Sequence, residues 1–186
     1  MKDHKGWCLW ITGLPGSGKS TITSLLESKL KTLDVSAEVV SVDQVRKHLT
    51  PTPTYTEEER SLVYAALVFT SFMLTKNGIN VIIDATGNRR RFRKQARRLI
   101  KGFMEVYVKC PLDICIHREK TRGQPHLAPP HIYTKAESGI APNVPGVGVP
   151  YERSSPEVTI DSSKLSPSEC VNVILKALNT RFLSEN

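Results

Sequence analysis

The sequence is poor in the features that mark secreted, membrane-spanning and metal-cluster proteins. It has only four cysteines, Cys8, Cys110, Cys115 and Cys170, with no CxxC pair and no histidine at metal-ligand spacing. This excludes a disulfide scaffold or a common zinc site and favours a reduced cytoplasmic compartment. The longest apolar-rich stretch, SLVYAALVFTSFML, is shorter than the roughly 18 residues of a membrane span, so we expect a core helix there.

Acidic residues are also in short supply. The chain carries 18 Asp and Glu against 26 Lys and Arg, which gives a net charge of +8. This excess favours anionic partners such as nucleotides, phosphates or nucleic acid, although it does not determine the fold. Hydrophobic residues make up 39% of the 186 residues, an ordinary share for a globular protein, so the length predicts one domain over residues 1–186.

Short apolar strands alternate with helices along the chain. This alternation predicts an α/β protein in which a mainly parallel sheet carries helices on both faces. Residues 119–156 are rich in proline and glycine and show weak periodicity, so we interpret them as a lid loop. The expected strands are residues 7–11, 37–42, 79–84, 104–110 and 157–161, and the expected helices begin near residues 19, 57, 89, 111 and 166.

The stretch GLPGSGKS follows the first strand and precedes a helix. It matches G-x-x-x-x-G-K-[ST], a pattern in which backbone N–H groups and a helix N-terminus surround nucleotide phosphates. Lys19 would contact the β- and γ-phosphates, and the Ser20 hydroxyl would bind Mg²⁺. Because no guanine-binding Asn/Thr-Lys-x-Asp pattern occurs, ATP is favoured over GTP. The expected nucleotide-binding residues are Gly13, Leu14, Pro15, Gly16, Ser17, Gly18, Lys19, Ser20 and Thr21.

A second motif, VSVDQVR, places Asp43 and Arg46 near the carboxyl end of the second strand, where ligands of such sheets bind. An acid there can accept a proton from an acceptor hydroxyl or hold Mg²⁺ through water, and an arginine can bind an acceptor phosphate. The structural alternative is an acid that starts a helix, followed by a solvated arginine. The motif favours a kinase, because a nucleotide switch without an acceptor would leave both residues unexplained.

The segment IIDATGNRRRFRKQARR joins an acid at a strand end to a basic helix. Asp84 is suited either to organise Mg²⁺ through water or to cap the following helix. In the helix we expect Phe92, Ala96 and Leu99 to be buried and the basic residues to share another side. That side is either a nucleic-acid patch or a solvated surface, and we favour the solvated surface. Its members are Arg90, Arg93, Lys94 and Arg97.

Taken in order, several segments resemble the adenylyl-sulfate kinases over nearly the whole chain. The resemblance implies a three-layer P-loop kinase-like fold with a C-terminal lid loop. It also implies transfer of the γ-phosphate of MgATP to the 3′-hydroxyl of adenosine 5′-phosphosulfate (APS), and it suggests a homodimer. The segments are ITGLPGSGKST, DQVR, YTEEER, IYTKAESG, PGVGVPYE and PEVTID.

Carried over to this chain, the resemblance implies roles for five residues. Asp43 would lie near the attacking 3′-hydroxyl, and Arg46 and Arg60 would hold the phosphosulfate. Tyr55 would stack on the adenine, where the family usually has Phe. Lys135 would neutralise charge during transfer.

The departures from the family pattern fall on the acceptor side. Val63, Ala65 and Ala66 stand where the family has an Asn and paired arginines, and Val144 replaces a Phe that closes on the adenine. Asp84 begins DATGN where the family has Ser-Phe-Ile-Ser-Pro, and DATGN is similar to the D-x-T-N segment of polynucleotide 5′-hydroxyl kinases. A different phosphorylated hydroxyl acceptor, either a nucleotide-linked metabolite or a polynucleotide 5′-hydroxyl, therefore stays open as the alternative.

Overall fold

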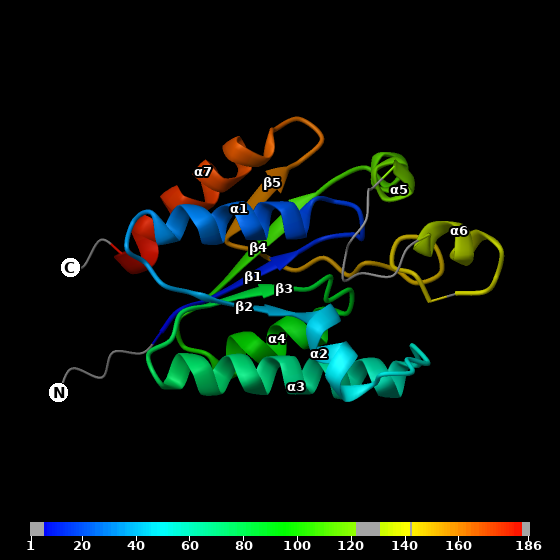
Figure 1. The fold of residues 1–186 in the computed structure, drawn as a ribbon, viewed down its shortest axis with the longest axis horizontal. Coiled ribbons are helices and arrows are strands. Elements are labelled where there is room, and N and C mark those ends of the chain that lie inside the picture. The colour runs from blue at the N-terminus through cyan, green and yellow to red at the C-terminus, as the bar shows by residue number, and fades with distance from the viewer. Residues whose placement is uncertain (1–5, 122–130, 142, 184–186) are drawn as a thin grey trace.

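The computed structural model describes residues 6–121, 131–141 and 143–183. In these residues the strands form a parallel sheet in the order β2-β3-β1-β4-β5 (Figure 1), as the α/β prediction requires. The predicted lid range, 119–156, includes residues 122–130 and 142, which lie outside the described residues. The strands are β1 (Cys8–Thr12), β2 (Glu38–Ser41), β3 (Val81–Asp84), β4 (Phe103–Lys109) and β5 (Val158–Asp161).

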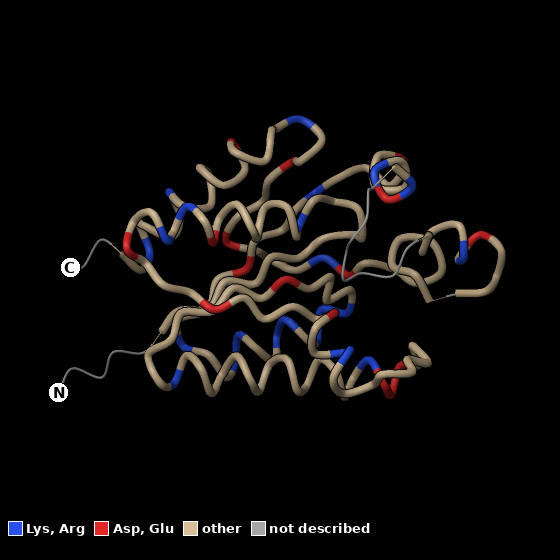
Figure 2. The backbone as a smooth tube through the Cα atoms, in the orientation of Figure 1, with Lys and Arg blue, Asp and Glu red and all other residues tan. Residues whose placement is uncertain are grey.

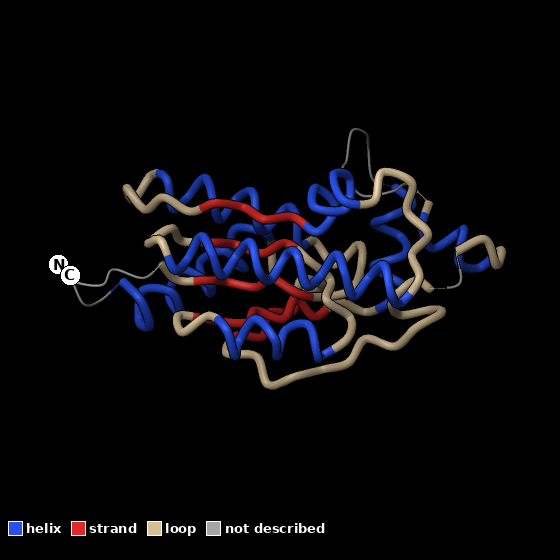
Figure 3. Tube along the Cα trace, turned by 90° about the horizontal axis from the view of Figure 1, so that it is seen from below, coloured by secondary structure: helices blue, strands red, loops and turns tan. Residues whose placement is uncertain are grey.

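Helices cover both faces of the sheet. α1 and α7 lie on one face, and α3 and α4 lie on the other (Figure 1). α5 and α6 lie beyond the carboxyl ends of the strands (Figures 1 and 3). The helices are α1 (Lys19–Lys31), α2 (Val42–Leu49), α3 (Glu57–Lys76), α4 (Arg90–Leu99), α5 (Leu112–Thr121), α6 (Ile132–Glu137) and α7 (Pro167–Leu178), followed by a π-helical turn, η1 (Asn179–Leu183).

The sheet separates two hydrophobic clusters, because neighbouring residues of a strand point to opposite faces. In β1, Leu9 and Ile11 pack with the residues of α1 and α7, whereas Cys8 and Trp10 pack with those of α3 and α4. All four are completely buried. Every cysteine of the chain is free and buried.

Two helices were not predicted, α2 and α6. α2 begins where the Ser41 side chain accepts a hydrogen bond from the Asp43 N–H (3.2 Å), a cap that satisfies a free donor of the first turn. The long helix α3 ends at Lys76 with Asn77 as its C-cap, and Gly78 follows in the left-handed conformation (φ 83°). Within the described ranges, every helix is too short or too polar to cross a membrane.

The expectation for the basic helix α4 was partly wrong. Arg93 is buried rather than solvated, and its guanidinium donates to the Glu105 carboxylate (2.9 Å) and to the carbonyl oxygens of Gly87 and Glu152. Leu99, which we expected to be buried, is 43% exposed. A long arginine side chain can reach buried acceptors on the sheet and on neighbouring loops. The spacing of charges along one helix does not reveal such acceptors.

Arg97 of the same helix also has a partner, because it forms an ion pair with Glu157. Of the predicted basic side, Arg90 and Lys94 are exposed. Lys and Arg positions are spread over both helical layers, with acidic positions among them (Figure 2). The buried Arg93 and the paired Arg97 therefore do not belong to the solvated basic side that we predicted.

Candidate active site

A large pocket of about 1070 Å³ brings most of the predicted site residues together. It lies at the carboxyl ends of the strands, where α/β sheets bind ligands. From the phosphate loop it is lined by Pro15, Gly16, Gly18, Lys19, Ser20 and Thr21, and from the rest of the chain by Asp43, Arg46, Tyr55, Arg60, Asp84 and Lys135.

The phosphate loop has the backbone geometry that its glycines predict. Gly16 and Gly18 have φ angles of 76° and 93°, which other residues rarely adopt. At Gly16 a Cβ atom would overlap the carbonyl oxygen of Cys115, whereas at Gly18 it would meet open space. Gly16 therefore packs the loop against α5, and Gly18 leaves room beside the start of α1.

Three residues of the predicted nucleotide-binding set do not line this pocket, namely Gly13, Leu14 and Ser17. At Gly13 a Cβ would overlap the backbone of β4. Leu14 packs against the apolar cluster formed by α5 and α6. Ser17 is completely buried, and its carbonyl oxygen accepts a hydrogen bond from the Ser162 hydroxyl (2.8 Å). These three residues therefore pack the phosphate loop against the rest of the protein and do not face the pocket.

Lys19, Ser20 and Asp84 form a polar group at the start of α1. The Lys19 Nζ donates to the Leu14 carbonyl oxygen (2.9 Å), and the side chains of Ser20 and Asp84 are hydrogen bonded. Burial raises the pKa of Asp84, while the charge of Lys19 and the hydrogen bond from Ser20 oppose that rise. The N-cap of α4 is Arg89, so Asp84 does not cap that helix.

Asp43 and Arg46 lie one turn apart on α2. The strand β2 ends at Ser41, so Asp43 belongs to the first helical turn rather than to the strand end that we predicted. Arg46 is only 9% exposed, which rules out the solvated alternative. Its guanidinium pairs with the Glu59 carboxylate, and its Cζ lies 4.8 Å from the centre of the Tyr55 ring.

Tyr55 and Arg60 connect this group to the segment after α6. Tyr55 has a φ of 56°, a left-handed conformation that is uncommon for a residue other than glycine. The Tyr55 carbonyl oxygen accepts from Arg60 Nε (3.1 Å), and Arg60 Nη2 donates to the Asn143 carbonyl oxygen (2.8 Å). α2, α3 and this later segment together make the side of the pocket where we predicted the acceptor to bind.

Two further pocket residues, Tyr64 and Arg118, were missed by the sequence analysis. The Tyr64 hydroxyl accepts a hydrogen bond from the Gly87 N–H (2.8 Å), and its ring stacks on Phe92 with the centroids 4.2 Å apart. Arg118 of α5 donates to the Ser162 carbonyl oxygen (2.8 Å). The apolar periodicity of α3 suggested only a core role for Tyr64, and a single arginine in α5 carries no recognisable pattern.

The residues that depart from the family pattern occupy two environments. Val63 is completely buried in α3 and does not line the pocket. Val144 lines the pocket and packs in the cluster that contains Tyr133, whose hydroxyl donates to the Pro15 carbonyl oxygen (2.8 Å). The part of the pocket formed by α6 and Val144 is therefore in direct contact with the phosphate loop.

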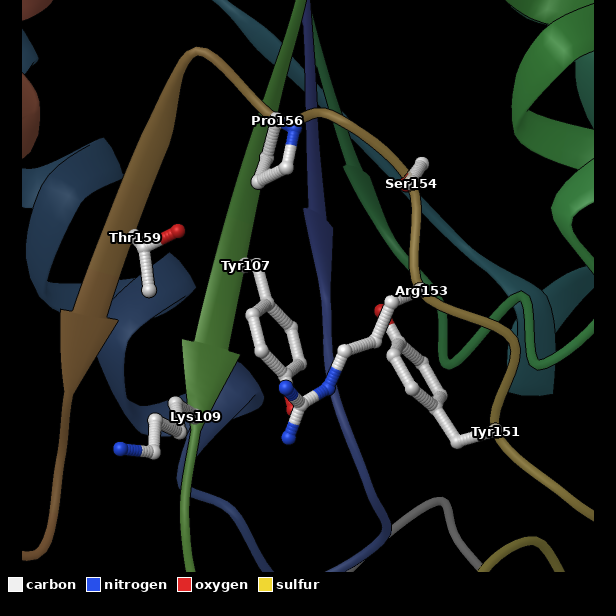
Figure 4. A pocket seen from close by; sticks show the side chains of 7 residues that line it. All are labelled: Tyr107, Lys109, Tyr151, Arg153, Ser154, Pro156 and Thr159. Carbon is white, nitrogen blue, oxygen red and sulfur yellow. The ribbon is translucent and has the colours of Figure 1, made fainter.

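A smaller pocket of about 210 Å³ lies between β4, β5 and residues 151–156 (Figure 4). The rings of Tyr107 and Tyr151 stack with their centroids 5.3 Å apart, and Arg153 lies beside them (Figure 4). The Tyr151 hydroxyl is hydrogen bonded to Thr12 Oγ1 (2.8 Å), which also donates to the Thr86 carbonyl oxygen (2.6 Å). None of the predicted site residues, all of which are described, lines this pocket; Tyr151 is bonded to the last residue of β1, directly before the phosphate loop.

The model of the family described as adenylylsulphate kinase matches residues 5–161. The chain belongs to this family. The adenylyl-sulfate kinase of Synechococcus sp. (strain JA-2-3B'a(2-13)) is 32% identical over 180 residues, which cover 96% of this chain and 98% of that relative. The probable adenylyl-sulfate kinase of Pyrococcus abyssi is 32% identical over 173 residues, 92% of this chain and 94% of that relative.

Solved structures agree with the sequence relatives. The Mycobacterium tuberculosis APS kinase CysC, in complex with AMPPNP and APS, superposes with a TM-score of 0.83 and 27% identity, covering 94% of this chain and 98% of that chain. A sugar kinase from Janibacter sp. shares the fold alone, with a TM-score of 0.68 at 16% identity. The predicted adenylyl-sulfate kinase family and its P-loop kinase-like fold are thus confirmed.

Proposed function

We propose that this protein transfers the γ-phosphate of ATP to the 3′-hydroxyl of APS. The observation that carries the proposal is that the phosphate loop and the group Asp43, Arg46, Tyr55 and Arg60 line one pocket. Holding a phosphoryl donor and an acceptor hydroxyl side by side supplies much of the catalysis in phosphoryl transfer. Membership of the adenylyl-sulfate kinase family supports APS as that acceptor over the alternative acceptors.

On the donor side, the chain binds ATP through the backbone of the phosphate loop and the start of α1. Lys19 is buried at this point, and its Nζ bonds the loop carbonyl of Leu14. When ATP binds, the ammonium group exchanges this carbonyl for oxygens of the β- and γ-phosphates. A cation held in a water-poor site stabilises the charge that develops on the phosphate during transfer.

On the acceptor side, Asp43 accepts the proton of the attacking hydroxyl or orients it. Arg46 and Arg60 bind the phosphosulfate, and Tyr55 supplies a ring for the adenine. Stacking of this kind contributes about 1–3 kcal/mol per base. Lys135 of α6 lines the same pocket and adds a positive charge to it.

The residues present also fit Mg²⁺ as the companion of ATP. Ser20 and Asp84 offer hard oxygen ligands beside Lys19, and they are already hydrogen bonded to one another. Among the described residues no group of three or more His, Cys, Asp or Glu is placed to hold a metal ion. When bound, Mg²⁺ supplies neutralisation of the phosphate charge.

We also propose a cytoplasmic homodimer that pairs through α3. Leu62, Phe69 and Met73 recur at helical spacing along this helix and are 60%, 60% and 40% exposed. A second copy of the same face would cover them. Light scattering during size-exclusion chromatography should give twice the 20.7 kDa chain mass, and Phe69→Glu should return the monomer.

An ATP-consumption assay across acceptors tests the proposed reaction. The acceptors are APS, adenosine 5′-monophosphate and a 5′-hydroxyl oligonucleotide, each with and without Mg²⁺. We expect turnover with APS, dependence on Mg²⁺ and no turnover with the oligonucleotide. Turnover with the oligonucleotide and none with APS would refute the proposed acceptor.

A further inference from the structure

Glu59 has no part in the reaction as described above, yet several contacts of the acceptor side converge on it. It lies in the first turn of α3, and only 9% of its side chain is exposed. One carboxylate oxygen accepts from Arg46 Nη1. The other accepts from the Thr54 N–H, from the Thr54 hydroxyl (2.6 Å) and from the Tyr55 N–H (3.0 Å).

The contacts to Thr54 and Tyr55 fix the backbone that carries the Tyr55 ring. Tyr55 has the left-handed φ of 56°, which costs a residue with a side chain roughly 1–2 kcal/mol. Such a conformation persists only where the surroundings hold it. Burial would raise the pKa of Glu59, but hydrogen bonds from Thr54 and Tyr55 and the charge of Arg46 hold it below its usual value, so the carboxylate remains a strong acceptor.

The contact to Arg46 fixes the direction of its guanidinium. Glu59 accepts from Nη1, and the Cζ atom lies 4.8 Å from the centre of the Tyr55 ring. Nε and Nη2 form the other edge of the fork, the arrangement that binds an oxyanion through two parallel hydrogen bonds. A flexible arginine without this anchor would have to lose several rotamers before it could bind a ligand in this way.

We infer that Glu59 is a positioning residue that orients both Arg46 and Tyr55 toward the acceptor. It acts on the phosphosulfate and the adenine through these two side chains. This inference rests on the proposed function, because it takes APS as the ligand that both residues bind.

The same helical turn supplies a matched control. Glu58 is one residue away, is exposed and carries the same charge. A general effect of acidic residues on the helix dipole or on the net charge would therefore appear equally at Glu58.

The test compares Glu59→Gln, Glu59→Asp and Glu58→Gln with the wild type. Steady-state kinetics give kcat and the KM of each substrate, and calorimetry gives the Kd of APS and of AMPPNP. We expect Glu59→Gln to raise the KM and Kd of APS about tenfold or more, as loss of hydrogen bonds to a charged group does, with the AMPPNP Kd unchanged. Glu59→Asp keeps the charge on a shorter side chain, so its KM and Kd for APS should lie between those of the wild type and of Glu59→Gln. Glu58→Gln should match the wild type.

An unchanged APS affinity in Glu59→Gln would overturn the inference, and so would an equal loss of APS and AMPPNP affinity, which marks a merely structural role. If Glu59→Gln does not fold, the same comparison on Glu59→Asp decides. A wild type that binds APS without phosphorylating it would refute the proposed function, while the binding comparison would still decide the role of Glu59. A wild type that does not bind APS would overturn both.

Discussion

The donor and acceptor halves of the pocket are built in different ways. In the proposed donor half, the phosphate loop and Lys19 come from one continuous stretch, whose backbone groups would surround the phosphates of ATP. The acceptor half is assembled from α2, α3 and the segment after α6, and its side chains hold one another through contacts such as Arg46 with Glu59 and Arg60 with Asn143. The donor half is therefore defined locally, and the acceptor half depends on long-range packing.

This difference explains where the chain has diverged. Phosphate binding by the loop depends on the backbone conformation that its glycines allow and on Lys19, so these positions tolerate little change. The acceptor half is made of side chains, and a substitution such as Val144 for an aromatic residue alters one contact without disturbing the rest. We therefore expect variants of the donor half to lose turnover while they still bind APS, and variants of the acceptor half to lose APS affinity while they still bind ATP.

The largest effect is expected for Lys19→Ala. Loss of the buried cation should lower kcat by roughly 10²–10³-fold or more, since it removes charge stabilisation in the transition state. The binding of APS, measured by calorimetry, should be nearly unchanged. Lys31→Ala, at the exposed end of the same helix, is the control. Near-wild-type turnover by Lys19→Ala would show that the donor half is not used as proposed.

Asp43→Asn should lower kcat by roughly 10²-fold or more, because a general base contributes at least that much. The KM of both substrates should change little, since the amide keeps the size and polarity of the side chain. Single-turnover kinetics with excess enzyme isolate the chemical step. The exposed Asp113→Asn serves as the control, and a kcat equal to that of the wild type would remove Asp43 from the chemistry.

Arg46→Ala should act on the acceptor alone. The KM of APS should rise roughly 10- to 100-fold, the range expected when hydrogen bonds to a charged group are lost. The KM of ATP should stay the same, because Arg46 lies on α2 and not on the phosphate loop. Arg91→Ala, at an exposed position of α4, should leave both constants unchanged. Parallel rises in both KM values would contradict the separation of the two halves.

The smallest expected effect is a difference in stability between alanine variants of two glycines in the phosphate loop. Gly18→Ala should destabilise the fold by about 1–2 kcal/mol, the cost of the left-handed backbone. Gly16→Ala should cost more, because its Cβ would also overlap the Cys115 carbonyl. Urea unfolding of both variants measures the difference. Equal free energies of unfolding would mean that the contact between the loop and α5 does not constrain the loop.

The sequence predicted most of the fold because local patterns determine it. Apolar strands such as β1 and the glycine-rich loop are signals within a few residues, and each occurs where we expected it. α2 was missed because its start depends on Ser41 capping a turn directly after a strand, with no intervening loop. Leu99 was misplaced because helical periodicity does not reveal where a helix leaves the sheet.

The candidate site was predictable only in part, for the same reason. Asp43, Arg46 and Asp84 stand in recognisable motifs, and the structure brings them to one pocket. Glu59 looked like one acid among several at a helix start, and only its contacts to Arg46 and Thr54 distinguish it. Arg93 looked like a surface charge until the carbonyl groups around it were seen.

Identification of the product is the most direct test of phosphoryl transfer from ATP to the 3′-hydroxyl of APS. The purified protein should be incubated with MgATP and APS, and the product analysed by ³¹P nuclear magnetic resonance and mass spectrometry. We expect one new phosphate on the 3′-oxygen of intact APS, with one ADP formed for each phosphorylated APS. ADP with free phosphate and unmodified APS, or a phosphate at any other position, would contradict it.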